Sequence, residues 1–252
     1  MKSQQMKLAL KELVLGVLAG ILIVAGCCVY LACSVKWVGA ILFSVALTAI
    51  CYLGFNLYTG KIGGMVANHK KEDFAALLLG LLGNTVGVLV AFAVAYAVPS
   101  LGEAAKAAVS AKLLQSPMQT LLRAVGCGVL MYVAVAIFRE KKSPIGILLC
   151  IPAFILSGFE HSIADMGYFA LAGVATPQSL GYVWLAILGN TVGSLLVAFA
   201  RRLVEFLGKS HTNPDSALDS TTKSAEENCV LQDATEVTPT EDTAAPQDSA
   251  EK

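Results

Sequence analysis

Charged residues are scarce in this chain: they make up 14% of it, whereas a soluble domain usually carries about a quarter. With 56% hydrophobic residues, the composition excludes an ordinary soluble domain. The sequence also lacks the HExxH, GxSxG, P-loop and GxGxxG motifs, so it predicts no enzyme and no cofactor. The cysteines show no metal-ligand spacing, and we expect neither a metal site nor a nucleic-acid partner.

The hydrophobic residues are gathered in runs of about 20, the length that spans a bilayer as a helix. We therefore predict an all-α membrane protein with six transmembrane helices, a short segment 1–12 before them and an acidic tail 209–252 after them. Residues 210–252 hold ten acidic and two basic residues, and their composition predicts disorder. The six runs are residues 13–33, 38–66, 74–98, 117–138, 144–171 and 181–200.

A five-residue motif, GNTVG, occurs at residues 83–87 and again at 189–193, an offset of 106. Each copy lies in a hydrophobic run, and each repeat unit holds three runs. An odd number of spans makes the second copy enter the membrane from the opposite side, which predicts two inverted repeats. The small residues and the amides favour close helix packing at Gly83, Asn84, Gly87, Gly189, Asn190 and Gly193.

The second and fifth runs are interrupted, by GFNLYTG at residues 54–60 and by SGFEH at 157–161. Adding the repeat offset to Gly54 gives Glu160, so we expect the two breaks to correspond. Paired broken helices are the best sequence pointer to a permeation site.

Lysine and arginine predict the orientation. If the N-terminus lies in the cytoplasm, the segments on the outer side of the membrane hold only three lysines and no arginine: Lys36, Lys106 and Lys112. This positive-inside bias places both termini in the cytoplasm. The inside segments hold Lys2, Lys7, Lys11, Lys70, Lys71, Arg139, Lys141, Lys142, Arg201, Arg202 and Lys209.

His161 is the only histidine within a run. Ionisable residues inside a membrane usually mark a pathway or a proton relay, and imidazole titrates near physiological pH. Asp165, one helical turn on, either stabilises a charged His161 ring, pairs with Asn190 or caps a half-helix. Glu160 directly precedes His161 in the sequence. Lys106 and Lys112 form either a weakly basic outer vestibule that attracts anions or part of a solvated loop.

Residues 157–166, SGFEHSIADM, closely resemble SGFEHSIANM, the fifth-span signature of the formate–nitrite transporters. The GNTVG motifs are similar to that family's GNxxG elements, and Leu57-Tyr58-Thr59 is similar to its Leu-Phe-Thr. The resemblance covers residues from about 5 to 208. It implies an aquaporin-like fold, a homopentamer in the plasma membrane with one pore per protomer, and formate, nitrite or hydrosulfide together with protons as the transported species.

The resemblance also implies roles for individual residues. His161 takes the place of the family's central histidine, beside Thr59, and Lys112 that of the lysine before the fourth span. Phe43 and Phe154 map to the outer constriction, and Leu47, Leu57 and Tyr58 to the inner one. Two positions depart from the family: Gly128 replaces an asparagine of the fourth span, and Asp165 replaces the asparagine of the signature.

Passage of a bare anion through apolar constrictions carries a large desolvation cost. We therefore expect a proton delivered near His161 to neutralise the anion, so that formate, the preferred candidate, crosses as an uncharged acid. A neutral-solute channel of the aquaporin kind is the alternative, but the sequence lacks paired Asn-Pro-Ala motifs. A purely structural scaffold would leave the paired breaks and His161 unexplained.

Overall fold

The computed structural model describes residues 2–66 and 70–209, and this part of the chain contains helices but no strand. The prediction of an all-helical protein is confirmed for these residues. Residues 210–252, all but the first of the predicted acidic tail, lie outside the described residues, as do Met1 and residues 67–69.

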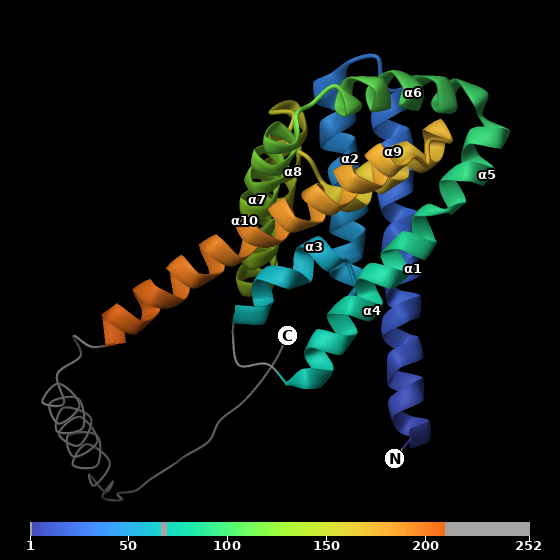
Figure 1. Ribbon diagram of the computed structural model, residues 1–252. Helices are drawn as coiled ribbons and strands as arrows, with labels where there is room; N and C mark the ends of the chain where they lie inside the picture. Colours follow the sequence, from blue (N-terminus) through green and yellow to red (C-terminus); the bar gives the residue numbers. More distant parts are fainter. Residues whose placement is uncertain (1, 67–69, 210–252) are drawn as a thin grey trace, which may run out of the picture. The chain divides into compact units, whose positions relative to one another are not determined.

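The helices follow one another along the chain with short connections (Figure 1). The first half contains α1 (Lys2–Ala32), α2 (Lys36–Leu53), α3 (Tyr58–Lys61), a 3-10 helix (Ile62–Val66), α4 (Lys71–Val88) and α5 (Val90–Ala97). The second half contains α6 (Pro99–Leu113), α7 (Pro117–Lys141), α8 (Ile145–Leu156), α9 (Ser162–Ala172) and α10 (Pro177–Lys209).

Among the described residues, five helices are long and apolar enough to cross a membrane: Ser3–Ala32, Lys36–Leu53, Lys71–Ala97, Pro117–Lys141 and Pro177–Gly208. The predicted fifth run forms two shorter helices instead, α8 of 12 residues and α9 of 11. Helix α1 begins at Lys2, so residues 2–12 of the predicted segment 1–12 are helical and continuous with the first span.

Local sequence explains where several helices begin and end. Pro117 opens α7, as predicted, and the Ser116 hydroxyl accepts a hydrogen bond from the N–H of Gln119. This is a favoured helix start, since proline has no N–H to leave unpaired. Gly54 ends α2 with φ 70°, and Gly158 follows α8 with φ 69°, a left-handed conformation that glycine adopts without strain.

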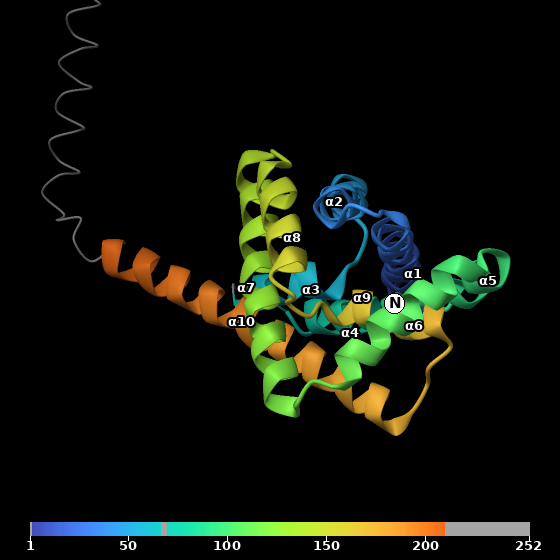
Figure 2. The same cartoon turned by 90° about the horizontal axis from the view of Figure 1, so that it is seen from above.

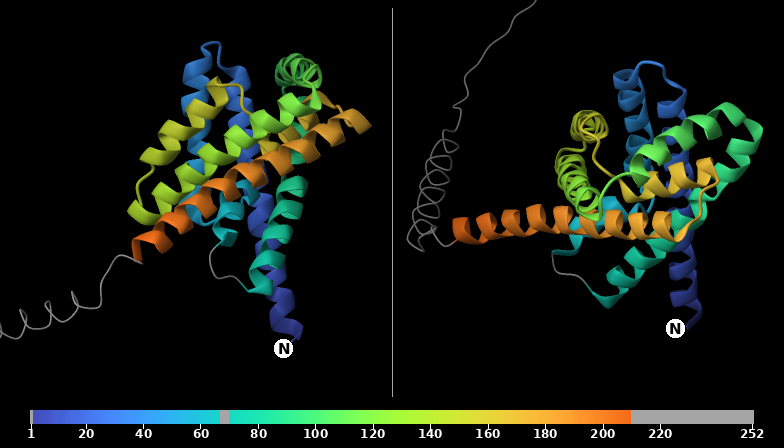
Figure 3. Two further views of the ribbon diagram at one scale, coloured as in Figure 1. Left: turned by 60° about the vertical axis from the view of Figure 1, so that its left-hand side comes forward. Right: turned by 45° about the horizontal axis from the view of Figure 1, so that its top comes forward.

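The two GNTVG motifs lie where long helices touch. A β-carbon at Gly83 or Gly87 of α4 would collide with the backbone of α1, at the carbonyl oxygens of Leu13 and Val17. A β-carbon at Gly189 of α10 would lie 2.7 Å from the carbonyl oxygen of Leu121 on α7. Figure 3 shows α7 and α10 lying against each other. Small residues therefore let the backbones of both helix pairs approach closely.

The short helices α3 and α9 lie between the longer ones. Seen from above, α1 and α2 lie on one side of them and α7 and α8 on the other (Figure 2). Helix α9 packs against α1, α4, α5 and α6, and α3 packs against α4 and α7. The buried parts of the two interruptions, residues 56–59 and 160–161, thus meet inside the protein, where Thr59 contacts His161.

Candidate functional site

Asn84 of α4 holds the chain at the first interruption. Its side-chain amide donates hydrogen bonds to the carbonyl oxygens of Gly16 and Asn56, at 2.9 and 2.8 Å. Its Oδ1 accepts one from the backbone N–H of Tyr58, at 2.9 Å. A buried polar group without a partner costs roughly 1–3 kcal/mol. One buried side chain therefore satisfies three backbone groups.

Asn190 of α10 does the same at the second interruption. It donates to the carbonyl oxygens of Ala124 and Glu160, at 2.9 and 2.8 Å, and accepts from the N–H of Ser162 at 2.9 Å. The expectation that Asn190 pairs with Asp165 is not met, because its donors and its acceptor all engage the backbone.

The two interruptions correspond at an offset of 104 residues, because Gly158 lies 104 residues after Gly54. The GNTVG motifs, by contrast, repeat at an offset of 106 residues. Gly54 matches Gly158, and in both cases the next N–H donates to the carbonyl oxygen five residues earlier, at 3.0 Å. The expected match of Gly54 with Glu160 is therefore wrong. The chain between break and motif is two residues longer in the second half. In this register Leu57 matches His161.

His161 is buried at the start of α9 and contacts three neighbours. Its Nδ1 accepts a hydrogen bond from the N–H of Ala164 at 3.1 Å, and its Nε2 lies 2.8 Å from Oγ1 of Thr59. The ring stacks on Phe154, with centroids 5.9 Å apart. A backbone N–H only donates, so Nδ1 carries no hydrogen and the neutral ring carries it on Nε2. A proton on Nδ1 would break the hydrogen bond that caps α9.

A first hollow, the His161 cavity, has a volume of about 250 Å³. Phe43 of α2 and Phe154 of α8, the predicted outer constriction, are among its lining residues. Its polar and charged lining residues are Tyr30, Lys112, Gln115, Arg123, Glu160, His161, Asp165 and Tyr168.

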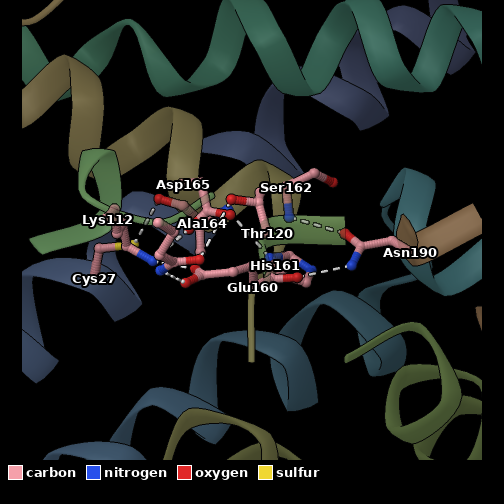
Figure 4. A network of polar contacts seen from close by, with 10 residues as sticks. Cys27, Lys112, Thr120, Glu160, His161, Ser162, Ala164, Asp165 and Asn190 are labelled. Atoms are coloured by element: carbon pink, nitrogen blue, oxygen red, sulfur yellow. Dashed lines mark hydrogen bonds and ion pairs between the residues drawn. The ribbon is translucent and has the colours of Figure 1, made fainter. Parts of the chain in front are cut away.

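Lys112, near the end of α6, contacts two carboxylates (Figure 4). Its Nζ lies 2.8 Å from Oδ1 of Asp165 and also contacts Oε2 of Glu160. Gln115, in the connection between α6 and α7, donates to the other oxygen of Glu160 at 2.7 Å. The exposed fractions of the Lys112, Glu160 and Asp165 side chains are 16%, 3% and 1%. A solvated loop lysine is thus excluded, and Asp165 does not cap a helix.

Helix α6 lies outside the candidate spans. Burial lowers the pKa of Lys112, but the charges of Asp165 and Glu160 and their hydrogen bonds raise it more, so the pKa lies above its usual value. The side chain stays an ammonium ion. Lys106 does not line the cavity and pairs with Glu103 at 2.8 Å, so the two lysines form no shared basic surface.

A second hollow, the Leu57 cavity, has a volume of about 230 Å³. Its apolar lining includes Leu47 of α2 and Leu57, two residues of the predicted inner constriction. Its charged lining residues are Lys61, Arg139 and Lys142. The third predicted residue, Tyr58, lines neither cavity, because its hydroxyl contacts Oγ1 of Thr191 at 2.9 Å and its ring packs on another cluster.

The two cavities lie toward opposite ends of α7. Arg123 lines one and Phe138 the other, and fifteen residues of α-helix rise about 22 Å. On α2, by contrast, Phe43 and Leu47 are only one turn apart, about 6 Å along the axis. The cavities therefore approach each other at a short apolar layer next to His161.

Sequence reasoning missed several lining residues. Gln115 lies just beyond the end of α6, in the connection to α7, so only its nearness to Lys112 in the sequence could have pointed to it. Lys61 follows the first interruption, where it pairs with Glu12 at 3.5 Å. Arg123 has no comparable signal. Gly128, one of the two departures from the resemblance, faces the carbonyl oxygen of Asn190, so a side chain there would force α7 and α10 apart.

Apolar helices of membrane-crossing length, interrupted helices that meet at a buried histidine, and two cavities define an integral membrane protein of the channel or transporter class. The family model described as formate/nitrite transporter matches residues 2–206. The chain therefore belongs to the formate/nitrite transporter family.

Two solved structures are similar to this chain. "Pentameric formate channel with formate bound" has 22% sequence identity and a TM-score of 0.67, and the match covers 80% of this chain and 98% of that one. "FNT family ion channel" has 23% identity and a TM-score of 0.61, with 82% and 90% covered. At this identity they establish the fold. The comparison with curated proteins gave no match.

Proposed function

We propose that this protein is a proton-linked channel for small monovalent anions of weak acids, with formate as the main substrate and nitrite or hydrosulfide as the alternatives. One observation carries the proposal: two cavities approach each other from opposite ends of α7 and are separated by a thin apolar layer with one polar pair, His161 and Thr59. A pathway of this form admits a small solute.

The apolar layer determines the form in which the solute crosses. Phe43 and Phe154 lie on the side of the layer that faces the His161 cavity, and Leu47 and Leu57 lie on the side that faces the Leu57 cavity. A bare anion would lose its hydration there at a cost of several kcal/mol, whereas a protonated weak acid carries no net charge. The acid thus crosses uncharged, and the pair of His161 and Thr59 supplies a hydrogen bond midway.

We also propose that the two halves are inverted repeats, with α1, α2/α3 and α4/α5 in one and α7, α8/α9 and α10 in the other. The equivalent hydrogen bonds of Asn84 and Asn190 support this assignment. The broken second and fifth spans are then α2/α3 and α8/α9. Residues 13–208 form the channel domain between cytoplasmic segments 1–12 and 209–252.

The lysine and arginine bias supports an orientation in the plasma membrane with both termini in the cytoplasm. The His161 cavity then faces outward and the Leu57 cavity faces inward. A reporter fused after Lys252 tests this, because it should be active only in its cytoplasmic form. The similar pentameric formate channel supports a homopentamer for this chain too, each protomer with its own pathway.

The substrate is tested with purified protein in proteoliposomes. Labelled formate, nitrite and hydrosulfide are offered to the same preparation, while a trapped dye reports internal pH. We expect formate uptake with accompanying acidification. Absence of flux for all three anions contradicts the proposal, and uptake without acidification contradicts proton linkage.

A further inference from the structure

One ammonium group serves two buried carboxylates in the His161 cavity. Lys112 contacts both Glu160 and Asp165, and both acids are more than nine-tenths buried. Glu160 receives a further hydrogen bond from Gln115, so both of its oxygens are engaged. Oδ2 of Asp165 is buried and has no hydrogen-bond partner among the described residues. The pair thus carries one more negative charge than its neighbours neutralise.

The other groups around the pair do not remove this excess. The rings of Tyr168 and Tyr182 lie 5.5 and 6.0 Å from Nζ of Lys112. Arg123 lines the cavity but is exposed. The remaining titratable neighbours are Tyr30, which also lines the cavity, His161, whose ring nitrogens are engaged elsewhere, and the buried thiols Cys27 and Cys127.

We propose that Asp165 and Glu160 together bind one proton, and that this pair, rather than the ring of His161, supplies the proton for transport. The inference rests on the proposed function and names its proton site. Two carboxylates that face each other across one cation hold a proton more readily than either alone, because both cannot easily stay charged. Aspartate at this position, where the family signature has asparagine, supplies the second carboxylate.

The proton also determines whether the cavity attracts anions. With the pair protonated, Lys112 and Arg123 contribute +2 and the pair −1, a net charge of +1. Without the proton the net charge is zero. Proton and anion therefore favour each other's binding, each by the same factor. The bound proton and the bound anion together carry no net charge.

Proton transfer from the pair to formate breaks the carboxyl O–H bond of the pair and forms an O–H bond on formate. Both carboxylates are then left charged beside Lys112. Formic acid moves on past His161. A proton from the outside water then reloads the pair.

Asp165→Asn tests this, because asparagine has nearly the same shape, keeps an oxygen for Lys112 and cannot bind the proton. In the wild type we expect the KM for external formate to rise roughly fivefold as the pH is raised and the pair loses its proton, as loss of one unit charge near 4 Å in water predicts. In Asp165→Asn we expect a low KM that does not change with pH. The control is Glu103→Gln, which removes an exposed acid of α6 outside the cavity and should keep the wild-type profile.

Infrared difference spectroscopy of the purified protein provides a readout that does not need transport. We expect a carbonyl band of a protonated carboxyl group that titrates in the wild type, persists in Glu103→Gln and is lost in Asp165→Asn. Glu160→Gln should also lose it, and this variant decides the matter if Asp165→Asn fails to fold.

A wild-type pH profile in Asp165→Asn, or a band that survives removal of either acid, overturns the proposal. Absence of any anion flux in the wild type instead contradicts the channel function, and the infrared band still decides where the proton binds.

Discussion

Leu57 and His161 occupy the same position in the two interruptions: each is the residue that immediately precedes a short helix, α3 or α9. Their backbones are alike, with φ −91° and ψ 121° at Leu57 and φ −105° and ψ 109° at His161. Only the histidine side chain accepts a hydrogen bond from its helix. A symmetric backbone thus carries an apolar side chain on one side of the pathway and a polar ring on the other.

His161→Asn should separate the structural role of the ring from its role in transport. Asparagine is a favoured helix cap, and its Oδ1 can replace Nδ1 as the acceptor for Ala164. We expect normal assembly, but formate flux reduced by about tenfold or more, since a lost hydrogen bond of about 1.5 kcal/mol has this effect.

The measurement is labelled formate uptake in proteoliposomes across about pH 5 to 8, with gel filtration to check assembly. The pH dependence of KM should survive, because Asp165 is still present. Wild-type flux in this variant would mean that His161 is only a cap.

Asn190→Ala should destabilise the fold strongly. It leaves the N–H of Ser162 and the carbonyl group of Glu160 in the interior without partners, which costs at least about 2 kcal/mol in unfolding free energy. Thr85→Ala in the other GNTVG copy is the control, because Thr85 is exposed and bonds its own helix at Leu81. Thermal unfolding in detergent compares the two, and equal melting temperatures would refute the anchoring role.

Gly193→Ala should disturb the contact between α7 and α10. Its β-carbon would collide with the carbonyl oxygen of Val125, and overpacking of this kind typically costs about 1–3 kcal/mol. Gly181→Ala in the same helix meets no atom within 4 Å and should leave stability unchanged or slightly higher. The melting temperatures of both variants provide the measurement, and a neutral Gly193→Ala would show that the helices can separate without cost.

Lys112→Met should destabilise the protein by about 3–5 kcal/mol at neutral pH, because it leaves two buried carboxylates without their cation. Lys106→Met removes a lysine of the same helix whose exposed pair with Glu103 contributes little. Denaturant unfolding of both variants tests the difference. If the Lys112 variant recovers stability on acidification, the cause is the uncompensated charge.

Much of the architecture is encoded locally and could be predicted. Run length and apolar composition predicted membrane-crossing helices, and the two GNTVG copies predicted equivalent roles for Asn84 and Asn190. The predicted fourth run began at Pro117, where α7 begins. The register of the interruptions was misplaced by two residues, because the repeat offset changes between break and motif and no residue type marks that change.

The sequence by itself determined the family, the helical class and the identity of the buried polar residues, since hydrophobic runs and motif spacing depend only on residues near one another in the chain. Tertiary structure alone decided which charges meet. Lys112 lies 53 residues before Asp165, and only the packing of α6 on α9 brings them to 2.8 Å. Packing likewise turned Tyr58 away from the pathway and exposed Arg123 to the cavity. Ion pairing and pore lining depend on distances between separate helices, which periodicity along one helix does not specify.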